Sequence, residues 1–232
     1  MSHPPATLTQ ERIRAVLIAV LQAAGQLAER GDYRLVGTAA AVLRGVDCPA
    51  ADIDILVKTH ADVDQFGAAL AAFPCLDAPA WIAQSQQYYA NYLVDGVEVG
   101  FSTVDIASDS DLIETFGPGP WQHYSLIACG PYRVPVVALE LRLITELYRD
   151  RPDRYQPILS GLGQLGADLD LVGRGLAFIG LPPARQEEIM QLLRTTQPNN
   201  TGNAGNAGEC NSPAGSARST FVDQSPNPER SS

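Results

Sequence analysis

Lysine is nearly absent from this chain of 232 residues, since Lys58 is the only one. Basic residues of both kinds number 16 against 26 acidic residues, which gives a formal net charge of −10. A surface this negative repels phosphate backbones, so a nucleic acid is a disfavoured partner unless a local basic stripe offsets the charge. We therefore expect this protein to act on something other than RNA or DNA.

Paired cysteines and long apolar runs are also missing. Cys48, Cys75, Cys129 and Cys210 are scattered, with no C-x-x-C pair and no histidine cluster beside them, so structural zinc is not expected and the thiols should be reduced. The apolar run over 15–21 is too short to cross a bilayer, and the first residues lack the basic and apolar regions of a secretory signal. These absences predict a cytoplasmic protein without a membrane partner.

The composition divides the chain into three predicted parts. Residues 1–137 are expected to form the core domain, and residues 138–196 a C-terminal helical lobe. From 197 to 232 the chain is rich in Asn, Gly, Ser and Pro, with one large apolar cluster at Phe221-Val222. Such a segment cannot bury enough surface to offset the entropy of ordering it, so we predict a disordered tail.

Hydrophobic spacing and turn residues predict an α/β (α+β) fold, with helices packed on a mixed β-sheet and a small helical lobe after it. Thr7 and Gln10 are typical of a capping box at the start of the first helix. Asp95-Gly96 between two β-prone runs is a strong hairpin signal. The expected helices cover about 10–31, 38–44, 61–73, 138–148, 154–162, 168–179 and 183–194, and the expected strands cover 33–37, 51–57, 88–94 and 97–103.

Two aspartates share one face of the strand predicted over 51–57. In the run ADIDILV, Asp52 and Asp54 alternate with apolar residues, so their carboxylates lie on the same side, roughly 6.5–7 Å apart along the chain. Like charges this close raise each other's proton affinity unless a cation relieves the repulsion. Mg²⁺ favours one or two carboxylates together with phosphate oxygens. A lone D-x-D is weak evidence, because exposed strands also carry two acids by chance.

Two further elements flank this strand in the sequence. Gly37-Thr38 closes the preceding strand and opens a short helix, where backbone N–H groups and the Thr38 hydroxyl can reach an anion; a plain strand-to-helix turn with a threonine cap fits equally well. Glu98 lies in Val97-Glu98-Val99 just after the hairpin turn. It is an ordinary solvent-facing acid unless its strand lies beside residues 51–57.

Taken together, the order VGT, then DIDI, then VEV resembles the signature of the polymerase-beta nucleotidyltransferase superfamily, in its compact bacterial branch. The resemblance implies a metal-dependent transfer of a nucleoside monophosphate from a nucleoside triphosphate (NTP) to a hydroxyl of a small molecule or a protein. It also implies that Asp52, Asp54 and Glu98 hold Mg²⁺ or Mn²⁺ and carry the catalysis, and that Gly37 and Thr38 bind the β- and γ-phosphates.

Other positions leave the site less defined. Arg44 follows the Gly-Thr helix and could reach a phosphate, or could be a solvated surface charge. Asp105 is an alternative to Glu98 as the third carboxylate. Relatives often carry a lysine on the helix after the sheet and an Arg-Pro-Lys-Asp run behind it; here the lysine position corresponds to Glu146, and the run becomes Arg151-Pro152-Asp153-Arg154. Loss of that cation would weaken triphosphate binding.

Two other functions fit some of these features. One is a non-catalytic nucleotide-binding or scaffold protein with a degenerate site, which the changes at Glu146 and Arg154 favour. The other is a glycosyltransferase that uses D-x-D for a metal and a sugar nucleotide, although the Gly-Thr turn upstream argues against it. A toxin-type role on another protein is also compatible with the resemblance, and an RNA target fits the acidic charge less well.

Overall fold

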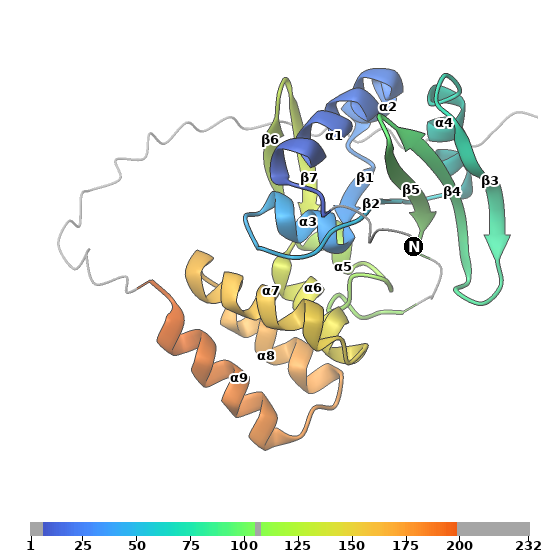
Figure 1. Cartoon of the computed structure of the whole chain (residues 1–232). Helices are drawn as coiled ribbons and strands as arrows, with labels where there is room; N and C mark the ends of the chain where they lie inside the picture. The colour runs from blue at the N-terminus through green and yellow to red at the C-terminus, as the bar shows by residue number, and fades with distance from the viewer. Residues whose placement is uncertain (1–6, 105–107, 199–232) are drawn as a thin grey trace, which may run out of the picture. The chain divides into compact units, whose positions relative to one another are not determined.

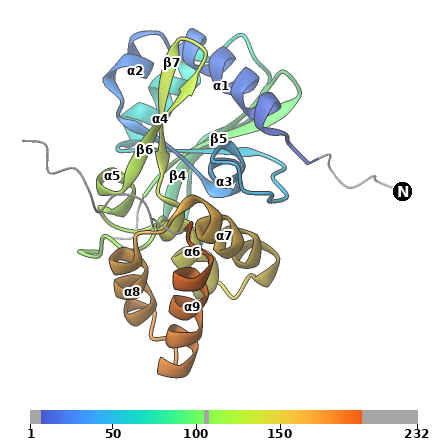
Figure 2. The same ribbon diagram turned by 90° about the vertical axis from the view of Figure 1, so that its left-hand side faces the viewer.

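The computed structural model describes residues 7–104 and 108–198, and Figures 1 and 2 show its ribbon in two views. Asp105, Cys210 and Phe221-Val222 lie outside the described residues, as does the predicted tail from 199 onward. No helix in the described part is long and apolar enough to span a membrane.

Within the described residues, seven strands form one mixed sheet in the order β3-β4-β5-β2-β1-β7-β6. β1 runs parallel to β7 and β2 runs parallel to β5, whereas all other neighbours are antiparallel. This arrangement confirms the predicted mixed sheet and places β5 directly beside β2. The strands are β1 Tyr33–Val36, β2 Ile53–Val57, β3 Cys75–Ile82, β4 Gln87–Val94, β5 Val97–Thr103, β6 Tyr124–Cys129 and β7 Tyr132–Val137.

The predicted helices are present with shifted ends. The first one is divided at Gly25, and its N-cap is Thr9, whose side chain accepts a hydrogen bond from the Arg12 N–H; the predicted cap at Thr7 is therefore wrong. The helices are α1 Gln10–Ala24, α2 Gln26–Arg30, α3 Gly37–Leu43, α4 His60–Ala69, α5 Gly119–Gln122, α6 Leu139–Tyr148, α7 Pro152–Leu165, α8 Leu169–Phe178 and α9 Pro183–Thr196.

Three strands have no counterpart among the predictions: β3, β6 and β7. β3 is an edge strand that is exposed along most of its length and contains Pro79, so it has neither an alternating pattern nor a continuous ladder. β6 and β7 form a hairpin around Gly130-Pro131, and Pro135 within β7 cannot donate to the ladder. Proline in a run counts against a strand, which explains why this hairpin was missed.

The two faces of the sheet have different environments. On one face, α4 packs against the sheet through Phe66, whose ring stacks on Phe101 of β5 at 4.8 Å and meets Tyr33 of β1 edge-on. The opposite face carries the alternate residues of β2 and β5, among them Asp54 and Ser102. Strand alternation therefore directs the acidic residues away from the core that α4 covers.

The helical lobe begins directly after the sheet. α6 follows β7 after Ala138 and contacts α3. α7 and α8 pack on α6, and α9 packs on α7 and α8 (Figures 1 and 2). Close packing depends on glycines: a Cβ at Gly175 would collide with Ile144, and one at Gly161 would collide with Val46. The contact between α3 and α6 brings the start of α3 near the polar residues of α6.

Candidate functional site

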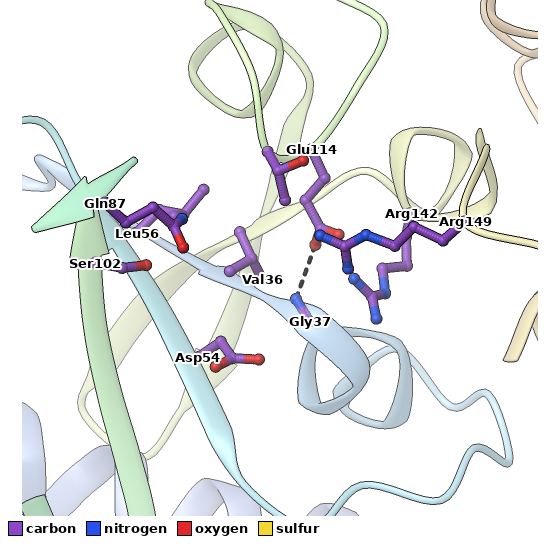
Figure 3. Close-up of a pocket in the computed structure, with 10 residues that line it drawn as sticks. Val36, Gly37, Asp54, Leu56, Gln87, Ser102, Glu114, Arg142 and Arg149 are labelled. Carbon is purple, nitrogen blue, oxygen red and sulfur yellow. Dashed lines mark hydrogen bonds and ion pairs between the residues drawn. The ribbon is translucent and has the colours of Figure 1, made fainter. Parts of the chain in front are cut away.

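A pocket of ≈ 150 Å³ lies where the face of the sheet that carries Asp54 meets α3 and α6 (Figure 3). It is smaller than the roughly 300–1,000 Å³ typical of sites that enclose a ligand, so a nucleotide placed here would extend out of it. Its polar residues come from β2, β4, β5, α6 and the segment before α5. The lining residues are Val36, Gly37, Asp54, Leu56, Gln87, Ser102, Glu114, Thr115, Arg142 and Arg149.

Gly37 and Asp54 lie against each other at one side of the pocket. Val36 and Asp54 are partners in the antiparallel ladder of β1 and β2, and Gly37 follows with a φ of 71°. A Cβ at Gly37 would collide with the Asp54 carboxylate. Glycine is therefore required here for two reasons: the left-handed backbone conformation and the close approach of the carboxylate.

The ionised form of the Asp54 carboxyl is disfavoured by its surroundings, which raises its pKa. Protein atoms crowd its carboxylate, and Asp52 and Glu114 add like charge, so its pKa is raised to about 7. The arginines Arg142 and Arg154 lower the pKa only in part. The side chain nevertheless reaches solvent through the pocket, which makes it accessible to a cation.

Asp52 and Glu98 are both exposed, at the N-terminal ends of β2 and β5, and neither is among the residues that line the pocket. Asp52 lies one residue before β2, and the register extended by one from the Ile53–Val99 pair aligns it with Glu98. Among the described residues, however, no three Asp, Glu, His or Cys side chains are close enough to share a metal ion. A joint metal site of Asp52, Asp54 and Glu98 stays a prediction.

Glu114 is a site residue that the sequence analysis missed. Its side chain is only 1% exposed and accepts a hydrogen bond from the Gly37 N–H at 2.8 Å (Figure 3). Its other carboxylate oxygen pairs with Arg142 at 2.5 Å, and its backbone N–H bonds the Thr145 hydroxyl on α6. A carboxylate of the chain itself thus takes the backbone donor that was expected to face a phosphate.

Arg142 is the second missed residue, and it changes the interpretation of Glu146. Both lie on α6 one turn apart, and the Arg142 guanidinium pairs with Glu146 at 2.6 Å as well as with Glu114. The helix after the sheet therefore does present a cation to the pocket, from Arg142 rather than from the position of Glu146. Glu146 is fully buried behind it and also lies 3.7 Å from Arg149 and 3.8 Å from Arg154.

Thr38 and Arg44, the two remaining predicted residues, are not among those that line the pocket. Thr38 is buried within α3, with 6% of its surface exposed. Arg44 is the C-cap of α3 and donates a hydrogen bond to the Ser125 hydroxyl on β6 at 3.1 Å. A role for either residue in phosphate binding stays a prediction, and the contact with Ser125 gives Arg44 a structural partner.

The missed residues lacked a recognisable signal for different reasons. Glu114 lies in an irregular segment without hydrophobic periodicity, far from Gly37 in sequence. Arg142 lies on a well-predicted helix, but aligning the expected lysine one turn later assigned the position to Glu146. A helical projection would have revealed that Arg142 and Glu146 share one face, because residues i and i+4 are neighbours.

Comparisons with known proteins give fold likeness only. No family model matches the chain, and no curated protein matches its sequence. Among solved structures, it resembles TM1012 of Thermotoga maritima, described as a candidate nucleotidyltransferase, at 15% identity and a TM-score of 0.46 over 62% of this chain and 90% of that one. An antigenic nucleotidyltransferase-like protein of Paracoccidioides brasiliensis gives 14% identity and 0.43 over 81% and 95%.

A third solved structure, of Cid1 in complex with its short product ApU, matches at 12% identity and a TM-score of 0.27, over 40% of this chain and 31% of that one. The resemblance to nucleotidyltransferases that the sequence predicted is thus also found among solved structures. Because these TM-scores are below 0.5, the functional argument rests on the residues of the pocket.

Proposed function

We propose that this protein is a metal-dependent nucleotidyltransferase that transfers a nucleoside monophosphate from an NTP to a hydroxyl of a small molecule or a protein. The observation that carries the proposal is the accessible Asp54 carboxylate, whose charge the surrounding protein does not neutralise, in a pocket that also contains arginine. Carboxylate and guanidinium groups in one open pocket suit a ligand that combines a divalent cation with phosphate.

The acidic residues fit a divalent cation. Asp52 and Asp54 supply the hard oxygen ligands that Mg²⁺ or Mn²⁺ prefers, and a bound cation would relieve the repulsion that raises the pKa of Asp54 to about 7. The metal would supply Lewis-acid stabilisation of the charge that develops on the phosphate oxygens. Glu98, aligned with Asp52 across the strands, remains the proposed third acidic residue.

The chain's own residues would then bind and orient the substrates. Asp54 must be ionised to hold a cation, and Glu98 would accept a proton from the attacking hydroxyl. Because Glu114 accepts the Gly37 N–H, the nearest positive charge for a phosphate comes from α6 instead of the Gly37-Thr38 turn. Gln87 and Ser102 add neutral polar groups to the opposite wall.

A non-catalytic nucleotide-binding or scaffold protein is the second candidate. The observation that favours it is Glu114, since its carboxylate engages both the Gly37 N–H and the Arg142 guanidinium. If those donors stay engaged, a nucleotide loses two of its contacts and the transfer step loses part of its charge stabilisation.

Calorimetric titration with each NTP in Mg²⁺ or Mn²⁺ tests the proposal. We expect wild type to bind at least one NTP only when the metal is present, and the Asp52→Asn/Asp54→Asn variant to lose that binding. Asp170→Asn is the matched control, because Asp170 is an exposed acid on α8 in the helical lobe. Metal-independent binding that survives the double substitution would favour the scaffold, and absence of binding by wild type would refute the nucleotide site.

If an NTP binds, incubation with the labelled NTP and candidate acceptors measures the transfer itself. Release of pyrophosphate that depends on Asp54 would establish the enzyme. Binding without pyrophosphate release under any condition that saturates the site would support the non-catalytic candidate.

A further inference from the structure

Arg142 lines the pocket, but its charge is already committed. Its side chain is 4% exposed, with one terminal nitrogen 2.5 Å from Glu114 and the other 2.6 Å from Glu146. Burial lowers its pKa, but the two glutamates outweigh that effect and raise it. A guanidinium held between two carboxylates has no free pair of terminal N–H groups for a phosphate. Binding a phosphate there would leave a buried carboxylate without its cation.

Arg149 is the other arginine in the pocket, and its donors are available. It caps the C-terminus of α6, and its side chain is 45% exposed. Its guanidinium lies 3.7 Å from Glu146, which is longer than a hydrogen bond, and within the described part of the chain its side chain makes no hydrogen bond. It is therefore a pocket cation that can form new hydrogen bonds without breaking existing ones.

Glu146 is the ion-pair partner of Arg149 among the described residues. Both of its carboxylate oxygens are buried and accept no hydrogen bond from the described residues, 7–104 and 108–198. Ion pairs alone therefore balance its charge. The Arg142 guanidinium lies 2.6 Å from the Glu146 carboxylate, whereas those of Arg149 and Arg154 lie 3.7 and 3.8 Å from it. The two buried glutamates, Glu114 and Glu146, thus face three guanidinium groups, so these two carboxylates leave one of the three cations unbalanced.

We propose that Arg149 binds the phosphate chain of the donor nucleotide, with Glu146 as the buried residue that positions it. The inference rests on the proposed function for the identity of the ligand, whereas the cation itself is defined by its place in the pocket. The planar guanidinium suits the oxygens of a phosphate, and a cation on Asp54 would offset the repulsion from the acidic wall. The ligand class is thus an inorganic or nucleoside polyphosphate bound together with a divalent cation.

Titration of the full chain with inorganic tripolyphosphate, and separately with a non-hydrolysable ATP analogue, both in Mg²⁺, tests the inference. We expect Arg149→Ala to weaken both ligands roughly tenfold to hundredfold, as for the loss of a charge-assisted hydrogen bond. Arg149→Lys keeps the charge but lacks the planar pair of N–H donors, so its affinity for both ligands should lie between those of wild type and Arg149→Ala. Arg151→Ala is the matched control: Arg151 is similarly exposed, pairs with Asp153 and does not line the pocket, so its affinity should stay within about twofold of wild type.

Each outcome separates this inference from the proposed function. Wild-type binding that Arg149→Ala leaves unchanged overturns the role of Arg149 and leaves the nucleotidyltransferase proposal standing. Equal losses in Arg149→Ala and Arg151→Ala indicate general charge attraction and also overturn it. Arg149-dependent binding that persists in Asp52→Asn/Asp54→Asn without metal supports the phosphate site but contradicts the metal-dependent enzyme. Absence of any binding by wild type refutes both.

Discussion

Two buried arginines near opposite ends of β1 are stabilised in different ways. Arg34, on β1 itself, is 6% exposed and donates to the carbonyls of Pro120, Gly31 and Tyr33, with the Tyr124 ring centroid 3.9 Å from its guanidinium carbon. Its partners carry no opposite charge, and burial lowers its pKa. Arg142, near Gly37, is 3% exposed and has two carboxylate partners, which raise its pKa.

The difference separates a structural contact from a functional pocket. Arg34 ties β1 to α5 and to β6, and nothing about its neutral partners requires a ligand. The cluster around Arg142 gathers acids and further arginines beside an open pocket that contains Asp54. Charged groups concentrated at one buried place are costly for folding and are more often found where a ligand is bound.

The largest effect should come from Arg142→Met. This change leaves Glu114 and Glu146 buried without their closest cation, so we expect the free energy of unfolding to fall by about 3–5 kcal/mol. Chemical denaturation followed by circular dichroism measures it. Adding Glu146→Leu to the same chain should recover part of the loss, because the second buried charge is then gone as well. A single substitution costing less than about 1 kcal/mol would show that water or a neighbouring cation already compensates the two glutamates.

A smaller effect is expected from Arg34→Met. Only neutral carbonyls and aromatic rings lose their partner, so the cost should be about 2 kcal/mol, measured by the same denaturation. If Arg34→Met lowers the free energy of unfolding as much as Arg142→Met does, the two arginines are not stabilised in different ways. We also expect Arg34→Met to leave NTP binding unchanged, because Arg34 does not line the pocket.

Most of the fold could be predicted from local patterns. The alternation in ADIDILV defined β2, and Asp95-Gly96 defined the turn between β4 and β5, where both residues have positive φ. Gly37 was recognised as a special position, and the structure adds the reason, which is the Asp54 carboxylate packed against it. These features depend on neighbours within a few residues, which is why the sequence alone reveals them.

The charged interior of the pocket could not be predicted in the same way. Glu114 reaches Gly37 across 77 positions in the chain, and its partner Arg142 lies 28 positions further on. Such contacts are set by the packing of α6 on α3, and no periodicity in the sequence records them. Glu146 shows the same limit, since its identity suggested a lost cation site, whereas the structure buries it against Arg142 with two more arginines 3.7 and 3.8 Å away.

The smallest effect concerns the Asp54 carboxyl, which shares the pocket with Arg142. The pKa of Asp54 is raised from 3.8 to about 7, so the folded state binds this proton more tightly than the unfolded state does, and Asp54 lowers stability increasingly as the pH rises through that interval. Asp54→Asn should therefore have a free energy of unfolding about 1 kcal/mol above that of wild type at pH 8. This is well below what the whole pKa shift would give, because solvent screens an accessible carboxylate. At pH 4 the variant and wild type should be equally stable. Thermal unfolding at both pH values measures the difference, with Asp170→Asn as the control. Mg²⁺ should remove the gain at pH 8 by stabilising wild type alone. A variant that is less stable than wild type at pH 8 without metal would mean that the folded chain stabilises the ionised carboxylate, and the argument for a cation at this position would fail.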